Sequence, residues 1–174
     1  MIYRRIRLVL GAGLLSVLLL GCTSGDSSSS VGTGEVIVKK SYHPNGKIMV
    51  ESPRIDGVRH GDKNMYREDG MLMQSTPYKN GNIDGKVKSY YKSGELKSET
   101  SWVEGQPEGM MIYYYKDGTV QSESPYVQGS IEGIVKTYYP TGELQSEVPY
   151  VHTKPKGMGK EYHKDGTVKL EKTF

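Results

Sequence analysis

Residues 114–129 read YYKDGTVQSESPYVQG and hold most of one unit of a pattern that recurs along the chain. A tyrosine opens the unit, and a glycine follows four residues later. This pair returns every 24 residues, without insertion, in six copies. The tyrosines are Tyr42, Tyr66, Tyr90, Tyr114, Tyr138 and Tyr162, and the glycines are Gly46, Gly70, Gly94, Gly118, Gly142 and Gly166. A fixed period predicts one structural unit, copied head to tail, in which each copy packs mainly on its neighbours.

Each copy is expected to fold as a β-hairpin. A small polar residue precedes the glycine, as in Asp117-Gly118, and such pairs supply the positive backbone angles of a tight turn. One strand therefore ends near Tyr115 and the next begins near Thr119. Later in each unit, a second pair of glycines such as Gly129 and Gly133 predicts a wider turn before the following copy.

The strand after the tight turn alternates in character, which is typical of a half-buried strand. In the third copy we expect one face to carry Leu96, Ser98, Thr100 and Trp102, and the other to carry Glu95, Lys97, Glu99 and Ser101. With two strands per copy, and 36–42 as the first, the chain contains about twelve strands. The sequence thus predicts an all-β fold: an elongated antiparallel meander of tandem 24-residue hairpins in a single-layer sheet over residues 36–174.

The register of the hairpin decides which residues lie opposite the tyrosines. A type I turn with a bulged glycine places Tyr114 opposite Val120, whereas a two-residue mirror-image turn gives that place to Tyr115. We favour the first, because the row of Tyr114 is tyrosine in every copy and the row of Tyr115 varies. In this register the tyrosines and the aliphatic residues are expected to share one face.

Residues 1–35 are expected to lie outside the repeat domain. Residues 1–21 have a charged start and an apolar core of 13 residues, Leu8 to Leu20, which is too short for a permanent membrane helix and is typical of an export signal. The ending Leu19-Leu20-Gly21-Cys22 resembles the lipobox of bacterial lipoproteins, although Leu20 is bulkier than usual there. That resemblance implies acylation of Cys22, a membrane anchor through its lipid, and sorting to the outer membrane if the source has one. An ordinary secretion signal and an uncleaved anchor are the alternatives, and residues 22–35 are predicted to form a flexible Ser/Gly tether.

Charge and cysteine content exclude several classes of function. The chain has 23 Lys and Arg against 20 Asp and Glu, and three of the arginines lie in the export signal, which leaves 20 of each sign. A balanced surface without a basic run gives no footprint for nucleic acid. Because Cys22 is the only cysteine, no intrachain disulfide can form.

The repeat resembles a known family. The pattern Tyr-x-x-x-Gly-x-Leu-x-x-Glu-x-x-Tyr-x-x-Gly-x-x-x-Gly is similar to the MORN-repeat variant found in tandem in bacterial envelope proteins, and it covers residues 36–174. The resemblance implies an elongated sheet of hairpins. Some bacterial members are described as antitoxins of the YwqK type, and standard MORN repeats have been associated with membranes and protein assembly.

No residues stand out as catalytic or metal-binding. The histidines His43, His60, His152 and His163 fall at three phases of the repeat, and no pair has the spacing of metal ligands. The acidic residues of each turn are too few for calcium. No nucleophile with a base can be named, and no phosphate-binding loop occurs. We therefore predict a protein that is not an enzyme and has no cofactor.

One segment, 110–115, is apolar on both expected faces of its strand. Two interpretations stay open: the buried middle of the sheet, or a contact patch for a partner or for self-association along a sheet face. We expect the contact residues to be exposed on the face opposite the tyrosine row. The candidates are Tyr91, Met111, Tyr113, Tyr115 and Tyr139.

The repeat, the tether and the predicted anchor favour a non-catalytic lipoprotein of the bacterial cell envelope that acts as a β-repeat scaffold for a protein partner. Two alternatives are an antitoxin or immunity protein that neutralises a partner toxin, and a cell-wall glycan binder that stacks sugars on aromatic rows. The antitoxin role rests on the family resemblance alone.

Overall fold

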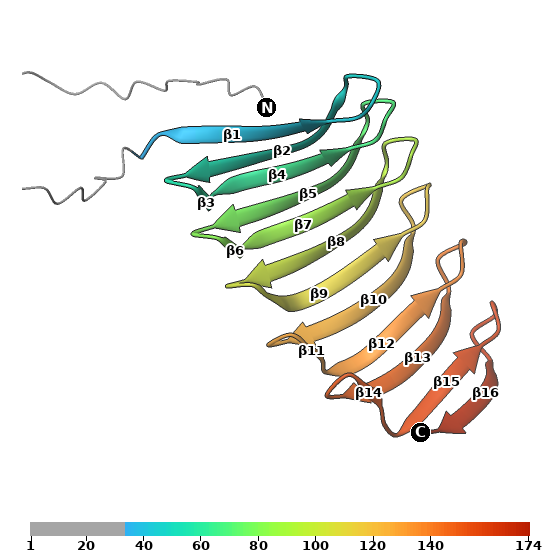
Figure 1. Ribbon diagram of the computed structural model, residues 1–174. Coiled ribbons are helices and arrows are strands. Elements are labelled where there is room, and N and C mark those ends of the chain that lie inside the picture. Colours follow the sequence, from blue (N-terminus) through green and yellow to red (C-terminus); the bar gives the residue numbers. More distant parts are fainter. Residues whose placement is uncertain (1–33) are drawn as a thin grey trace, which may run out of the picture.

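A computed structural model describes residues 34–174, so the predicted signal peptide (1–21), Cys22 and most of the predicted tether lie outside the described residues. The described chain is all-β and forms one antiparallel sheet (Figure 1). Twelve strands lie side by side in sequence order, which confirms the predicted single-layer meander. They are β1 (Val36–Tyr42), β2 (Ile48–Ile55), β4 (Gly61–Tyr66), β5 (Leu72–Lys79), β7 (Gly85–Tyr90), β8 (Leu96–Val103), β9 (Gln106–Tyr114), β10 (Val120–Val127), β12 (Gly133–Tyr138), β13 (Leu144–Val151), β15 (Met158–Tyr162) and β16 (Val168–Thr173).

Four two-residue strands extend the hairpins at one side of the sheet. Each pairs with the end of the long strand before it. They are β3 (Val58–Arg59), β6 (Asn82–Ile83), β11 (Ser130–Ile131) and β14 (Lys154–Pro155). In the fourth copy the corresponding residues belong to the start of β9.

The turn after each tyrosine has the predicted form. The Tyr115 amide donates to the Thr119 carbonyl at 2.8 Å, and the Gly118 amide donates to the Tyr115 carbonyl at 3.0 Å. Gly118 has φ +87°, a value that favours glycine. Tyr114 therefore pairs with Val120, as the bulged-glycine register predicts, and the other five hairpins pair in the same way.

The second turn is tighter than predicted. Glu104 and Gly105 both have positive φ, 48° and 87°, and Val103 pairs with Gln106, so the loop holds two residues only. The second glycine of the pair, such as Gly133 with φ 112°, instead allows a bulge a few residues later. The last of these turns keeps this geometry although Thr153 replaces glycine: Thr153 has φ 65°, and its hydroxyl accepts a hydrogen bond from the Ile131 amide at 3.1 Å.

The sequence predicted that the repeat tyrosines and the glutamates lie on different faces of the sheet. This prediction is wrong. In every hairpin one residue of the second strand is unpaired; in β8 it is Lys97, because Leu96 pairs with Tyr90 and Ser98 pairs with Ser89. This bulge shifts the alternation of all later residues by one. The Tyr66, Tyr114, Tyr138 and Tyr162 hydroxyls consequently reach the glutamates and share their face.

No hydrophobic residue in the range 34–174 is buried. The buried residues with polar side chains are small, namely Ser52, Thr76 and Thr100. A single-layer sheet exposes both of its faces, so it cannot build a core between layers. The stability of the fold must come from the ladder of backbone hydrogen bonds and from contacts between neighbouring repeats.

Candidate interaction surface

The two faces of the sheet differ in chemistry. We call the side that carries the six repeat tyrosines and the glutamate row the tyrosine face, and the opposite side the serine face. The serine face holds the three buried residues named above, and its Ser89 and Ser98 hydroxyls lie 2.7 Å apart.

On the tyrosine face, the hydroxyls of four repeat tyrosines connect their repeat to the repeat before it. Tyr138 donates to Glu123 at 2.8 Å and Tyr162 donates to Glu147 at 2.6 Å. Tyr66 and Tyr114 make the same contact with Glu51 and Glu99. Burial, followed by the hydrogen bond to Glu123, raises the pKa of Tyr138 to about 12. The repeat tyrosines are thus part of the structure of the junctions.

Lysines lie across the strands from the glutamate row. Lys88, Lys136 and Lys160 lie opposite Glu99, Glu147 and Glu171. The Lys160 ammonium lies 3.5 Å from Glu171, and Lys40 forms an ion pair with Glu51. Both signs therefore alternate across the strands of this face.

Three of the five predicted contact residues have a structural role, and none of the five is exposed. Tyr91, Tyr115 and Tyr139 are half-buried. Their hydroxyls donate to the carbonyls of Tyr114, Tyr138 and Tyr162, at 2.6, 2.7 and 2.8 Å. Arg67 and His43 reach the equivalent carbonyls of Tyr90 and Tyr66 at 2.8 and 2.9 Å. The prediction of exposure is wrong, because this variable row spans the gap between neighbouring turns.

The other two predicted contact residues, Met111 and Tyr113, lie on the face opposite the repeat tyrosines, as expected. Both are half-buried. Met111 pairs with Thr100 and Ser124, and Tyr113 pairs with Ser98 and Ser122. The interpretation of 110–115 as a buried middle is wrong, because Met110 is 45 % exposed and the other five residues are only half-buried.

Six exposed apolar residues instead gather on the tyrosine face of the C-terminal half. They come from two rows of the repeat, and each is 41–53 % exposed. We call them the apolar strip: Val103, Val127, Val151, Met110, Ile134 and Met158. Met110 pairs with Pro125 and Ile134 pairs with Pro149, so prolines fill the positions between the two rows.

The unbroken run of exposed apolar residues in these two rows lies in the later repeats. The second and third hairpins hold charged residues at these positions, namely Asp62, Lys79 and Lys86, whereas the first hairpin holds Val38 and Ile55. Exposed apolar residues that gather on one face are typical of surfaces that contact another molecule. The sequence signal for these residues is their recurrence at 24-residue intervals in two separate rows, which alternation within a single strand does not reveal.

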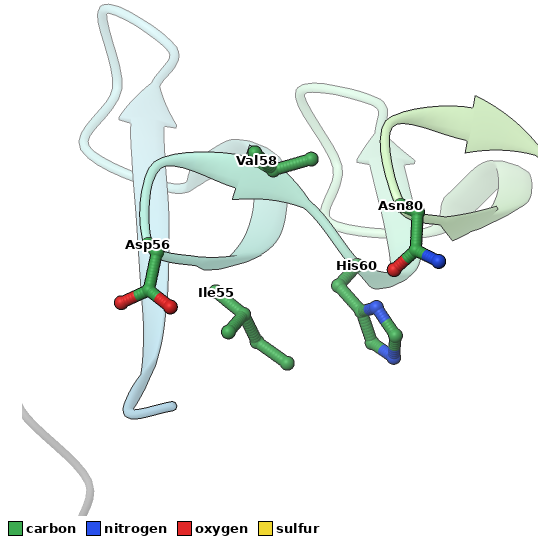
Figure 2. A pocket seen from close by; sticks show the side chains of 5 residues that line it. All are labelled: Ile55, Asp56, Val58, His60 and Asn80. Carbon is green, nitrogen blue, oxygen red and sulfur yellow. The ribbon is translucent and has the colours of Figure 1, made fainter. Parts of the chain in front are cut away.

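The hollow drawn in Figure 2 lies at the other end of the sheet and is shallow. Its volume is about 390 Å³, and its lining comes from the second turns of the first two copies. In Figure 2 the Ile55 side chain lies between the Asp56 carboxylate and the His60 ring. The acid and the base therefore lie on either side of Ile55 in this hollow.

Within residues 34–174 no group of three or more His, Cys, Asp or Glu could hold a metal ion. The same part of the chain contains no helix long and apolar enough to span a membrane.

The fold and surface define a repeat-based binding scaffold. The MORN repeat variant family matches the chain at residues 36–56, 83–104, 107–128 and 131–152, which together make half of its length. The chain therefore belongs to the MORN repeat variant family. The second and sixth copies lie outside the matched segments, yet they form the same hairpins, β4–β5 and β15–β16. A comparison with curated proteins gives no match.

Proposed function

We propose that this protein is a non-catalytic scaffold that binds another protein through the apolar strip. The observation that carries the proposal is the exposure of all six strip residues on one face, in four consecutive repeats. Full burial of an exposed side chain of this kind contributes roughly 1.5–3 kcal/mol, and the strip residues, which are already about half buried, can gain about half of that in an interface. A few of them, together with the paired charges beside them, support a specific complex.

The MORN repeat family is generally non-catalytic, which agrees with this proposal. The lining of the hollow in Figure 2 gives no reason to assign a reaction.

The proposal also places the scaffold in the bacterial cell envelope, through a lipid on Cys22. Its support is the Leu-Leu-Gly-Cys ending of the apolar leader. We expect Cys22→Ser to release the chain from the membrane fraction and to abolish incorporation of labelled palmitate. A chain that stays in the membrane fraction without label would contradict acylation.

The binding role is tested by capture from native membranes with the full chain as bait. The variant Val127→Lys with Ile134→Lys places two charges in the strip. The matched control, Gln121→Lys with Gln145→Lys, places the same charges at exposed bulge positions. We expect the strip variant to lose its partner at least tenfold and the control to retain it, with unchanged circular dichroism in both.

If both variants capture the same proteins as the natural chain, the strip is not the binding surface. The antitoxin and glycan roles stay hypotheses that the same bait tests. A captured toxin would favour the first, and sedimentation with purified cell walls would favour the second.

A further inference from the structure

The sheet has two unpaired edges. Within residues 34–174, β1 pairs with β2 alone and β16 pairs with β15 alone, whereas the other ten long strands have partners on both sides. Figure 1 shows the two edges at opposite ends of the sheet. An unpaired edge presents free amide and carbonyl groups, which form a template for another strand.

Junctions inside the sheet show what such an edge accepts. Five times, the second strand of one repeat pairs with the first strand of the next. At the last junction Ser146 lies opposite Glu161, and Glu147 lies opposite Lys160. The Tyr162 hydroxyl donates to Glu147, and the Tyr139 hydroxyl donates to the Tyr162 carbonyl.

The two edges carry the two halves of this junction. One period further along the repeat, Glu171 on β16 corresponds to Glu147, while on β1 Lys40 and Tyr42 correspond to Lys160 and Tyr162. Tyr42 is 45 % exposed. His163 occupies the row of Tyr139, and a histidine is able to serve there, because His43 already contacts the Tyr66 carbonyl at 2.9 Å.

We propose that β16 of one copy pairs with β1 of a second copy of this chain, antiparallel and in the register of the internal junctions. Glu171 then lies opposite Lys40 of the next copy, and Leu170 lies opposite Ser41. The hydroxyl of Tyr42 of the next copy donates a hydrogen bond to Glu171. Because this contact joins different surfaces of the two copies, it leaves a free edge at each end and continues the sheet into an open filament.

One pair in this register is unfavourable. At the internal junctions the position equivalent to Lys172 holds an uncharged residue. An example is Thr100, which lies opposite Met111. Between copies, Lys172 lies opposite Lys39. Like charges opposite each other weaken strand pairing, so the contact is expected to be weak and to tighten when this pair is removed.

Cross-linking tests the register directly. The full chain is prepared with Cys22→Ser, and Ser41→Cys and Leu170→Cys are introduced into separate batches, which are mixed and treated with a short bifunctional thiol reagent. A single chain with Ser122→Cys and Thr137→Cys serves as the control, because these residues form the equivalent pair inside the sheet.

We expect dimers from the mixture and none from either batch alone. Lys172→Thr should raise the dimer yield about twofold, and Glu171→Lys should lower it by a similar factor. The strip variant Val127→Lys with Ile134→Lys should cross-link normally, which separates this contact from partner binding.

Two outcomes would overturn the proposal. If the control chain cross-links and the mixture does not, the edges do not pair. If Ser41→Cys alone or Leu170→Cys alone gives the dimers, the copies meet through like edges and the head-to-tail order is wrong.

Discussion

At the scale of single residues, glycine is required where its neighbours leave no room. A Cβ atom on Gly85 would lie 3.0 Å from Cγ of Pro77, and Gly85 has φ +119°. Gly109 occupies the same place in the next copy, with φ +79°, but nothing lies within 4 Å of its Cβ position. The difference arises because Ser101 replaces the proline of the other copies.

These two glycines give a matched prediction. Gly85→Ala should cost about 2–3 kcal/mol, because it adds a steric conflict to the strain of positive φ, and Gly109→Ala should cost about 1 kcal/mol from φ alone. Urea unfolding followed by circular dichroism measures both. Equal losses would show that Pro77 relaxes freely and that the contact has no cost.

At the scale of the strand, the tyrosine–glutamate contacts make the junctions depend on pH. In the unfolded chain a tyrosine ionises near its ordinary pKa of 10.0, whereas the pKa of Tyr138 in the fold is about 12. Its contribution to stability is therefore complete below pH 10 and is lost as the pH rises toward about 12.

Tyr138→Phe tests this dependence. At pH 7 the variant should lose about 1 kcal/mol with the hydrogen bond to Glu123, and the difference from the natural chain should shrink between pH 10 and 12. Tyr90→Phe is the control, because the glutamate of its row is replaced by Ser75 and the described residues show no hydrogen bond from the Tyr90 hydroxyl. A difference that does not change with pH, or an equal loss in both variants at pH 7, would contradict this account.

The strands, their order and the pairing of Tyr114 with Val120 could be predicted from the sequence, because turn glycines and a strict period determine them. The face of the sheet on which the glutamates lie could not be predicted, because no glycine or proline in the sequence marks the bulge at Lys97. The role of Tyr91, Tyr115 and Tyr139 was also missed. Their row contains His, Arg and Tyr, which share the ability to donate a hydrogen bond to a carbonyl although they look unrelated in sequence.

At the scale of the whole molecule, the sheet is a one-dimensional array in which each repeat contacts only its neighbours. Removal of residues 85–108 takes out one whole period of the repeat. The chain then continues at the equivalent position of the next repeat, so the register of the junction is kept. We expect this variant to keep its β circular dichroism and to unfold cooperatively, with a sheet shorter by about 10 Å in small-angle scattering.

Removal of residues 85–96, half a period, is the matched comparison. It places the first strand of one copy where the second strand of another belongs, so cooperative unfolding should be lost. If both deletions fold equally well, the register of the junctions is not what holds the sheet together.

In the described chain, the side-chain contacts between repeats join only hairpins that are consecutive along the chain. Each tyrosine–glutamate hydrogen bond on the tyrosine face, and each carbonyl beside the turns that accepts a hydrogen bond from a tyrosine hydroxyl, joins a hairpin to the one made just before it. During synthesis, therefore, a newly emerged hairpin already has its finished docking site, and no segment must wait for a distant part of the chain. Folding can therefore proceed while the chain is being synthesised. This shortens the time for which an unpaired, aggregation-prone strand edge is exposed to other chains.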